Sequence, residues 1–132
     1  MSRGLGYPAA LEGALKIKEL TGIQAQGYSA ADFRHGPIAT LGPDTAVLII
    51  DTQGPGSTDL RELTALARAR GASTALCAPS PEAQLRLPNG VSELLQTLLA
   101  MIRTQQLALE LAVLQGTDPD APRGLSKVTP TN

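Results

Sequence analysis

The sequence is poor in aromatic residues, cysteine and histidine. Its aromatic residues are Tyr7, Tyr28 and Phe33, so a core must be built from leucine, alanine, isoleucine and valine. Cys77 is the single cysteine, which excludes a disulfide within one chain. Together with the single His35 it disfavours a zinc site of cysteine and histidine ligands. We expect no metal and no cofactor.

The chain also lacks an excess of charge of either sign. Eleven basic and twelve acidic residues give a formal net charge of −1. Nucleic-acid-binding domains usually carry a basic excess and often aromatic stacking platforms, so this composition disfavours a nucleic-acid partner. A small anionic ligand needs only a local site and is compatible with this balance.

Long apolar runs and a signal peptide are missing as well. The longest apolar region, residues 94–114, is interrupted by glutamines, Arg103 and Glu110. We therefore expect it to fall short of a membrane span. A length of 132 residues with 42% hydrophobic and 17% charged side chains predicts one globular domain. The expected location is the cytoplasm, with no membrane partner.

The order of predicted elements is that of an α/β protein with a parallel sheet. Apolar residues at helical spacing, bounded by proline or glycine, predict helices over residues 9–20, 59–70 and 91–115. Apolar runs over residues 46–51 and 73–78 predict buried parallel strands, and residues 84–87 a short third strand. Ser29 is expected to cap a short helix that reaches Arg34.

The chain opens with a glycine turn that leads into the first helix. Residues 4–9 match the dinucleotide pattern G-x-G-x-x-A, but no strand precedes them and no acidic residue ends a strand at the required distance. A tight turn is the favoured interpretation. Because such turns usually follow a strand, we expect the chain to begin just after a strand that a longer parent supplies. An incomplete sheet exposes an apolar edge, which predicts a homo-oligomer.

Three charged residues of the first helix share one narrow arc. At about 100° per residue, Glu12, Lys16 and Glu19 point the same way. One interpretation is a set of solvated ion pairs, each worth a few tenths of a kcal/mol. The other is a carboxylate base whose pKa is set by the neighbouring ammonium. The residues alone favour the solvated pairs.

Four further features have a structural interpretation, a functional one, or both. His35 enters a loop before Gly-Pro, and a lone histidine is more often structural than catalytic. Lys127 lies in a Pro-rich tail and is either an exposed lysine or an amine that forms a Schiff base. The Gly/Ser loop of residues 52–58 could cradle a phosphate. Cys77, in the middle of a predicted strand, is interpreted as structural.

Two segments together resemble a known family. They are YPAALEGALKIKELTGIQAQGYSAADFRHGP (residues 7–37) and GTDPDAPRGLSKVT (residues 116–129). They resemble the isomerase domain of the glutamine–fructose-6-phosphate aminotransferases, or glucosamine-6-phosphate synthases. They also resemble relatives without a glutaminase domain, which deaminate and isomerise glucosamine 6-phosphate. These are sugar-isomerase (SIS) domain proteins with two SIS subdomains in tandem.

The resemblance implies a fold and a division of the chain. The expected fold is an α/β three-layer sandwich with a parallel sheet, lacking its first strand. Residues 1–116 correspond to the second SIS subdomain, and residues 117–132 to a C-terminal active-site tail. The missing first subdomain is then an expected partner, and its Ser/Thr phosphate loops have no counterpart here.

The resemblance also assigns roles by motif. Glu19 corresponds to the base that moves a proton between sugar carbons 1 and 2, and Glu12 and Lys16 to substrate-binding positions on the same helix. His35 corresponds to the histidine that helps open the sugar ring in a neighbouring subunit's site. Lys127 corresponds to the lysine that forms an imine with open-chain fructose 6-phosphate.

Several departures keep the reaction open. Residues 23–28 read IQAQGY where the synthases commonly read IHAEAY, and Asp32 replaces a glutamate before His-Gly-Pro. The tail is closer to the deaminase-like relatives. The resemblance thus implies part of a phosphosugar isomerase or aminotransferase that acts on fructose 6-phosphate or glucosamine 6-phosphate. The alternatives are a glucosamine-6-phosphate deaminase-type isomerase and a non-catalytic phosphosugar-binding or dimerisation module.

Overall fold

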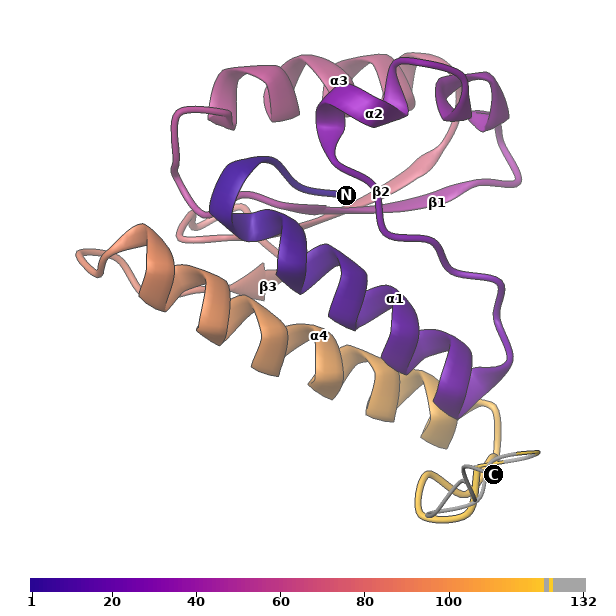
Figure 1. Cartoon of the computed structure of the whole chain (residues 1–132). Helices are drawn as coiled ribbons and strands as arrows, with labels where there is room; N and C mark the ends of the chain where they lie inside the picture. The colour runs from indigo at the N-terminus through magenta and orange to yellow at the C-terminus, as the bar shows by residue number, and fades with distance from the viewer. Residues whose placement is uncertain (123, 125–132) are drawn as a thin grey trace, which may run out of the picture.

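The computed structural model describes residues 1–122 and Gly124, in which a sheet lies between two layers of helices (Figure 1). The elements are α1 (Tyr7–Thr21), α2 (Ala30–Phe33), β1 (Ala46–Ile50), α3 (Ser57–Ala69), β2 (Ser73–Ala78), β3 (Leu85–Arg86) and α4 (Glu93–Leu114). Short 3-10 helices cover Gly4–Gly6 and Pro37–Thr40. The three long helices and the strands lie within two residues of their predicted bounds. The 3-10 helix after Gly36 was not predicted.

The described part of the sheet has the strand order β1-β2-β3, with both pairs parallel. Helices α1 and α4 cover one face, and α2 and α3 cover the other (Figure 1). Strand β1 pairs with β2 from Ala46 opposite Ser73 to Ile50 opposite Cys77. The predicted α/β fold with a parallel sheet is therefore confirmed.

Each face of the sheet supports its own core. Successive strand residues point to opposite faces, so Ile49 and Ile50 enter different clusters. Ile49 packs with Phe33 and Leu63 on the side of α2 and α3. Ile50 packs with Cys77 and with alanines of α1 and α4. These two cores hold the helical layers against the sheet.

Helix α1 begins and ends where its residues predict. Pro8 occupies the first turn, where its missing N–H is not needed. Gly22 ends the helix with a φ of 71°, and its N–H donates to the carbonyl of Lys18. The predicted cap of α2 is confirmed as well, because Ser29 Oγ accepts the N–H of Asp32 at 3.2 Å.

The first half of β1 differs from the buried strand that its apolar sequence predicts. Ile49 and Ile50 are each only 1% exposed. Val47 and Leu48 are half-buried and Ala46 is exposed. The reason lies at the edge of β1 that faces away from β2. At that edge, the described part of the chain pairs only with the last residues of β1.

Met1 and Ser2 form that short edge. The Met1 amino group donates to Leu48 O at 2.7 Å, and the Ile50 N–H donates to Met1 O at 2.9 Å. Ser2 forms a parallel bridge with Ser29 on its other side. The first two residues therefore pair like a strand, and the glycine turn and α1 follow them.

By length and composition alone, helix α4 is long and apolar enough to cross a membrane. The mean hydropathy of its most apolar 18-residue stretch is 1.2. This differs from the expectation drawn from its polar residues. In the structure 28% of that stretch is buried. Ala100, Thr104 and Ala108 are buried at four-residue spacing. One stripe of α4 therefore packs inside the domain, as in an amphipathic core helix.

Candidate functional site

The charged face of α1 carries the sequence-predicted site. Lys16 Nζ lies 2.7 Å from Glu19 Oε2, and the two side chains are 34% and 30% exposed. The hydrogen bond to Glu19 raises the pKa of Lys16, and the charges of Glu19 and Glu12 add to that effect. Partial burial opposes the rise. Lys16 is therefore a firmly protonated ammonium held against a carboxylate.

Glu12 takes part in a different contact. Its Oε1 accepts a hydrogen bond from Gln105 Nε2 of α4 at 3.0 Å. The neighbouring residue, Gly13, lies against Thr104 of α4. A Cβ at position 13 would lie only 2.8 Å from Thr104 Cβ, so glycine permits the close approach of the two helices. Gln105 had no signal in the sequence, because its role depends on which face of α4 meets α1.

The C-terminal segment starts beside the end of α1. Thr117 Oγ1 donates to the carbonyl of Leu20 at 3.2 Å and lies 3.0 Å from the carbonyl of Ala112 in α4. The segment after α4 therefore leaves the domain next to the C-terminal end of α1 (Figure 1). Lys127 lies outside the described residues. The predicted division at residue 116 stays a prediction.

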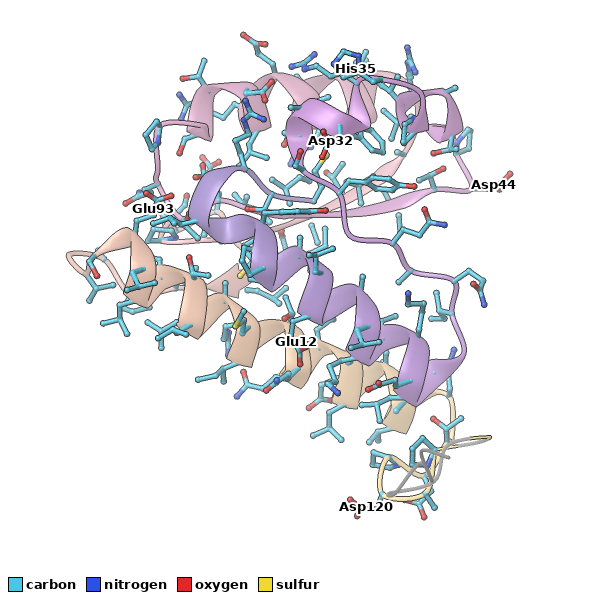
Figure 2. The ribbon with its side chains drawn as sticks, in the orientation of Figure 1. Glu12, Asp32, His35, Asp44, Glu93 and Asp120 are labelled. Atoms are coloured by element: carbon cyan, nitrogen blue, oxygen red, sulfur yellow. The ribbon has the colours of Figure 1, made fainter. Side chains whose placement is uncertain are left out.

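His35 is not brought to this face within one chain. It is exposed at the end of α2, on the opposite side of the sheet from Glu12 of α1 (Figure 2). The preceding Arg34 fixes this end of α2, because its guanidinium lies 2.6 Å from Asp59 Oδ1 of α3. The structure thus gathers Glu12, Lys16 and Glu19 and separates His35 from them.

The loop of residues 52–58 is in contact with two carboxylates. Asp51 Oδ1 accepts the N–H of Gln53 at 2.8 Å and the hydroxyl of Ser57 at 2.6 Å. Glu93 Oε1 accepts the hydroxyl of Thr52 at 3.3 Å. A Cβ on Gly54 would collide with the Glu93 carboxylate. Two carboxylates thus contact this loop, and Arg61 and Arg68 of α3 line the groove beside it.

The remaining candidates have structural places. Cys77 is buried in β2, and burial raises the pKa of its thiol to about 12. It is a neutral core side chain at neutral pH. The glycines of residues 4–6 form the 3-10 turn before α1. Among the described residues, no group of three or more His, Cys, Asp or Glu side chains is placed to hold a metal ion.

The charged face of α1 is only partly covered by the rest of the described chain. In the described part of the chain, one groove of about 350 Å³ is lined by Ala14 and Ile17 of α1 and by β1. A second, of about 700 Å³, lies at the loop after β1. The side chains of Glu12, Lys16 and Glu19 line neither of these two. An enclosed site around them requires a further surface packed over α1.

Comparison with known proteins places the chain in a family context. Residues 1–86 match the family model described as SIS domain. The glutamine–fructose-6-phosphate aminotransferase (isomerizing) of Thermosynechococcus vestitus is 40% identical over 136 residues, which cover 96% of this chain and 21% of that protein. The protein of the same name from Thermococcus kodakarensis is 38% identical over 133 residues, covering 96% of this chain and 22% of that protein. The chain spans about a fifth of the length of these relatives.

Solved structures agree with the family match. The C-terminal domain of glucosamine-fructose-6-phosphate aminotransferase from Francisella tularensis superposes with a TM-score of 0.77 at 27% identity, covering 88% of this chain and 35% of that one. The glucosamine-6-phosphate deaminase from Thermotoga maritima superposes with a TM-score of 0.71 at 25% identity, covering 92% of this chain and 36% of that one. Both similarities extend over most of the described fold.

Proposed function

The chain belongs to the SIS domain family, and we propose that it supplies one half of an isomerase centre for hexosamine phosphates. The observation that carries the proposal is the Lys16–Glu19 pair on α1, from whose end the C-terminal segment departs. The similarity to aminotransferases and a deaminase of glucosamine 6-phosphate supports the substrate class. The family alone would leave the reacting groups open.

Glu19 is proposed as the base that moves a proton between carbons 1 and 2 of the open-chain sugar. A carboxylate suits this transfer when it is ionised and lies within hydrogen-bond reach of the sugar carbon's proton. Lys16 holds the Glu19 carboxylate in place at 2.7 Å. Because its pKa is raised, Lys16 also keeps a positive charge beside the negative charge that develops on the sugar oxygen.

Glu12 is proposed to bind a sugar hydroxyl from the same face of α1. Its bond to Gln105 fixes the carboxylate and leaves oxygen lone pairs for a ligand. Lys127 is proposed to reach the substrate from the C-terminal segment and form the imine. His35 is proposed to serve the site of a neighbouring subunit, since it lies across the sheet from Glu12.

The proposed centre needs a second SIS subdomain. The charged face of α1 is only partly covered, and two carboxylates contact the loop of residues 52–58. We therefore propose that the partner subdomain binds the sugar phosphate. Titration calorimetry of this chain with glucosamine 6-phosphate, with glucosamine as the control, tests that assignment. Saturable binding of the phosphosugar alone would place the phosphate site in this chain.

The base assignment is tested in an intact enzyme. We would replace the matching segment of the Thermosynechococcus vestitus aminotransferase with this chain and measure isomerisation of fructose 6-phosphate. Glu19→Gln should lower kcat by about 10² to 10⁴-fold with little change in KM, because it removes one general base. The matched control is Glu82→Gln, a carboxylate exposed in the turn after β2. Retained turnover in Glu19→Gln would reject the assignment.

A deaminase-type isomerase is the second candidate. It is favoured by the similarity to the deaminase from Thermotoga maritima. The same replacement enzyme, given glucosamine 6-phosphate and no glutamine, would release ammonia under this alternative. A non-catalytic module would instead bind the phosphosugar without turnover in either assay.

A further inference from the structure

The loop between β3 and α4 presents the pair Asn89-Gly90 to solvent. Both residues are exposed, and the loop lies at the opposite end of α4 from the C-terminal segment (Figure 1). Gly90 has a φ of 77°, and nothing lies within 4 Å of the place where a Cβ would stand. Among the described residues, neither the Asn89 side-chain amide nor the Gly90 N–H forms a hydrogen bond. Both groups are therefore free to react.

The side chain of an asparagine can react with the main-chain nitrogen of the next residue. The Gly90 nitrogen attacks Asn89 Cγ, a five-membered succinimide ring closes, and the bond from Cγ to Nδ2 breaks. The departing nitrogen takes up the proton of the Gly90 N–H and leaves as ammonia. Water then opens the ring. Attack at Cγ leaves an aspartate, and attack at the main-chain carbonyl carbon leaves an isoaspartate.

The residue types and the backbone of this loop favour ring closure. Glycine has no Cβ to obstruct the approach of its nitrogen to Asn89 Cγ, and it tolerates the main-chain rotations that the ring requires. In a helix or a strand interior the N–H would be held by a carbonyl oxygen. Asn89 and Gly90 lie after the end of β3 and before Ser92, the N-cap of α4, so no such partner holds the nitrogen.

The loop is anchored on both sides, so the reaction does not require the fold to open. Leu87 is only 2% exposed, and its N–H donates to Ala78 O at 3.0 Å. Gln96 Nε2 of α4 donates to Pro88 O at 2.6 Å. The exposed pair lies between these anchors, and the buried side chains of α4 lie beyond them. Both the starting protein and the product should therefore be folded.

We propose that Asn89 is a site of spontaneous deamidation in the folded protein, with water as the co-reactant and with aspartate and isoaspartate as the products. Asparagine is among the thermally labile residues. The chain also has Gln-Gly pairs at residues 26–27, 53–54 and 115–116. Glutamine has one more methylene and must close a larger ring, and Gln53 Nε2 already donates to Pro79 O at 3.4 Å. Asn89 is therefore the favoured position.

The rate in the folded protein distinguishes this proposal from damage to an unfolded chain. Exposed loops without hydrogen bonds open at almost no cost in free energy, so the folded protein should deamidate within about tenfold of the rate of a short peptide. A reaction that required global unfolding would be slower than in the peptide by the folding equilibrium constant, about 10³-fold or more.

The test incubates the full chain and an acetylated, amidated peptide of residues 86–94 side by side at mildly alkaline pH. Cleavage after Arg86 and Arg103 releases residues 87–103, in which Asn89 is the only asparagine and Gln96 the only glutamine. The mass of that fragment should rise by the difference between water and ammonia, and its fragmentation should place the change at position 89. A sample taken at time zero corrects for deamidation during cleavage.

Two variants complete the test. Asn89→Gln keeps an amide in the same loop but needs the larger ring, so the mass change should be lost. Asn89→Asp supplies the aspartate product as a chromatographic standard, from which the isoaspartate product should separate. Deamidation more than about tenfold slower in the folded protein than in the peptide would overturn the proposal. A mass change at Gln96 in place of position 89, or equal deamidation in Asn89→Gln, would overturn it as well.

Discussion

The contact between Gly13 and Thr104 sets how closely α1 approaches α4, and Gly13→Ala tests it. A Cβ at position 13 would lie 2.8 Å from Thr104 Cβ, 3.0 Å from its Oγ1 and 3.1 Å from its Cγ2. Carbon atoms at an optimal contact are about 3.5–4.0 Å apart. The nearest atom is a Cβ attached directly to the α4 backbone, so a side-chain rotation does not relieve the overlap.

Two effects of Gly13→Ala oppose each other. Alanine favours a helix interior over glycine by up to about 1 kcal/mol. Overpacking a tight core contact costs about 1–3 kcal/mol. Because the strained contact involves backbone-attached atoms, we expect the upper part of that range. The net result is a loss of about 1–2 kcal/mol in the free energy of unfolding, measured by urea denaturation.

A double-mutant cycle separates the two effects. Thr104→Gly removes all three contacted atoms and moves the glycine to the other helix. In that background Gly13→Ala should become stabilising, with a coupling free energy of about 1–2 kcal/mol. Stabilisation by Gly13→Ala in the native background, or additive effects of the two changes, would refute the close-packing explanation. The Glu12–Gln105 contact lies beside this pair, so the charged face of α1 should shift with it.

Three other predictions concern stability. Because the folded pKa of Cys77 is raised from 9.0 to about 12, the unfolded thiol ionises first. The native protein should therefore lose about 1 kcal/mol more stability than Cys77→Ala between pH 8 and pH 10; equal pH dependence of the two in urea titrations would contradict this. Leu63→Ala should lower the free energy of unfolding by about 2–5 kcal/mol, because Leu63 is fully buried; a loss below about 1 kcal/mol, half the usual minimum, would argue against its core position. Ser29→Ala should cost about 1 kcal/mol through the lost cap of α2, and an unchanged urea midpoint would show that the cap contributes nothing.

The sequence predicted the elements well because their signals are local. Strand residues 73–78 have the bounds that their apolar run indicates. Pro8, Gly22 and Ser29 mark helix ends by their own backbone and hydrogen-bonding preferences. The pairing of Lys16 with Glu19 likewise follows from helical spacing within one element.

Features that depend on contacts between elements were not predictable. Ala46 is exposed because the described residues place no neighbour along much of one edge of β1, which the apolar run of β1 does not reveal. The bond of Glu12 to Gln105 depends on the crossing of α1 and α4. The separation of His35 from Glu12 depends on which layer each helix joins. The residues therefore identified the charged helix face better than its surroundings.

The anchoring of Thr117 limits how far from α1 residue 127 can lie. The Thr117 hydroxyl ties the start of the C-terminal segment to the end of α1, and Lys127 follows ten residues later. A chain of that length spans at most about 35 Å, whatever its conformation. One amine confined to a sphere of that radius has an average concentration on the order of 10 mM, typical of a short tether. If this lysine forms an imine with a substrate bound at α1, the reaction is effectively intramolecular. Free lysine or another primary amine would then need millimolar concentrations to compete with it.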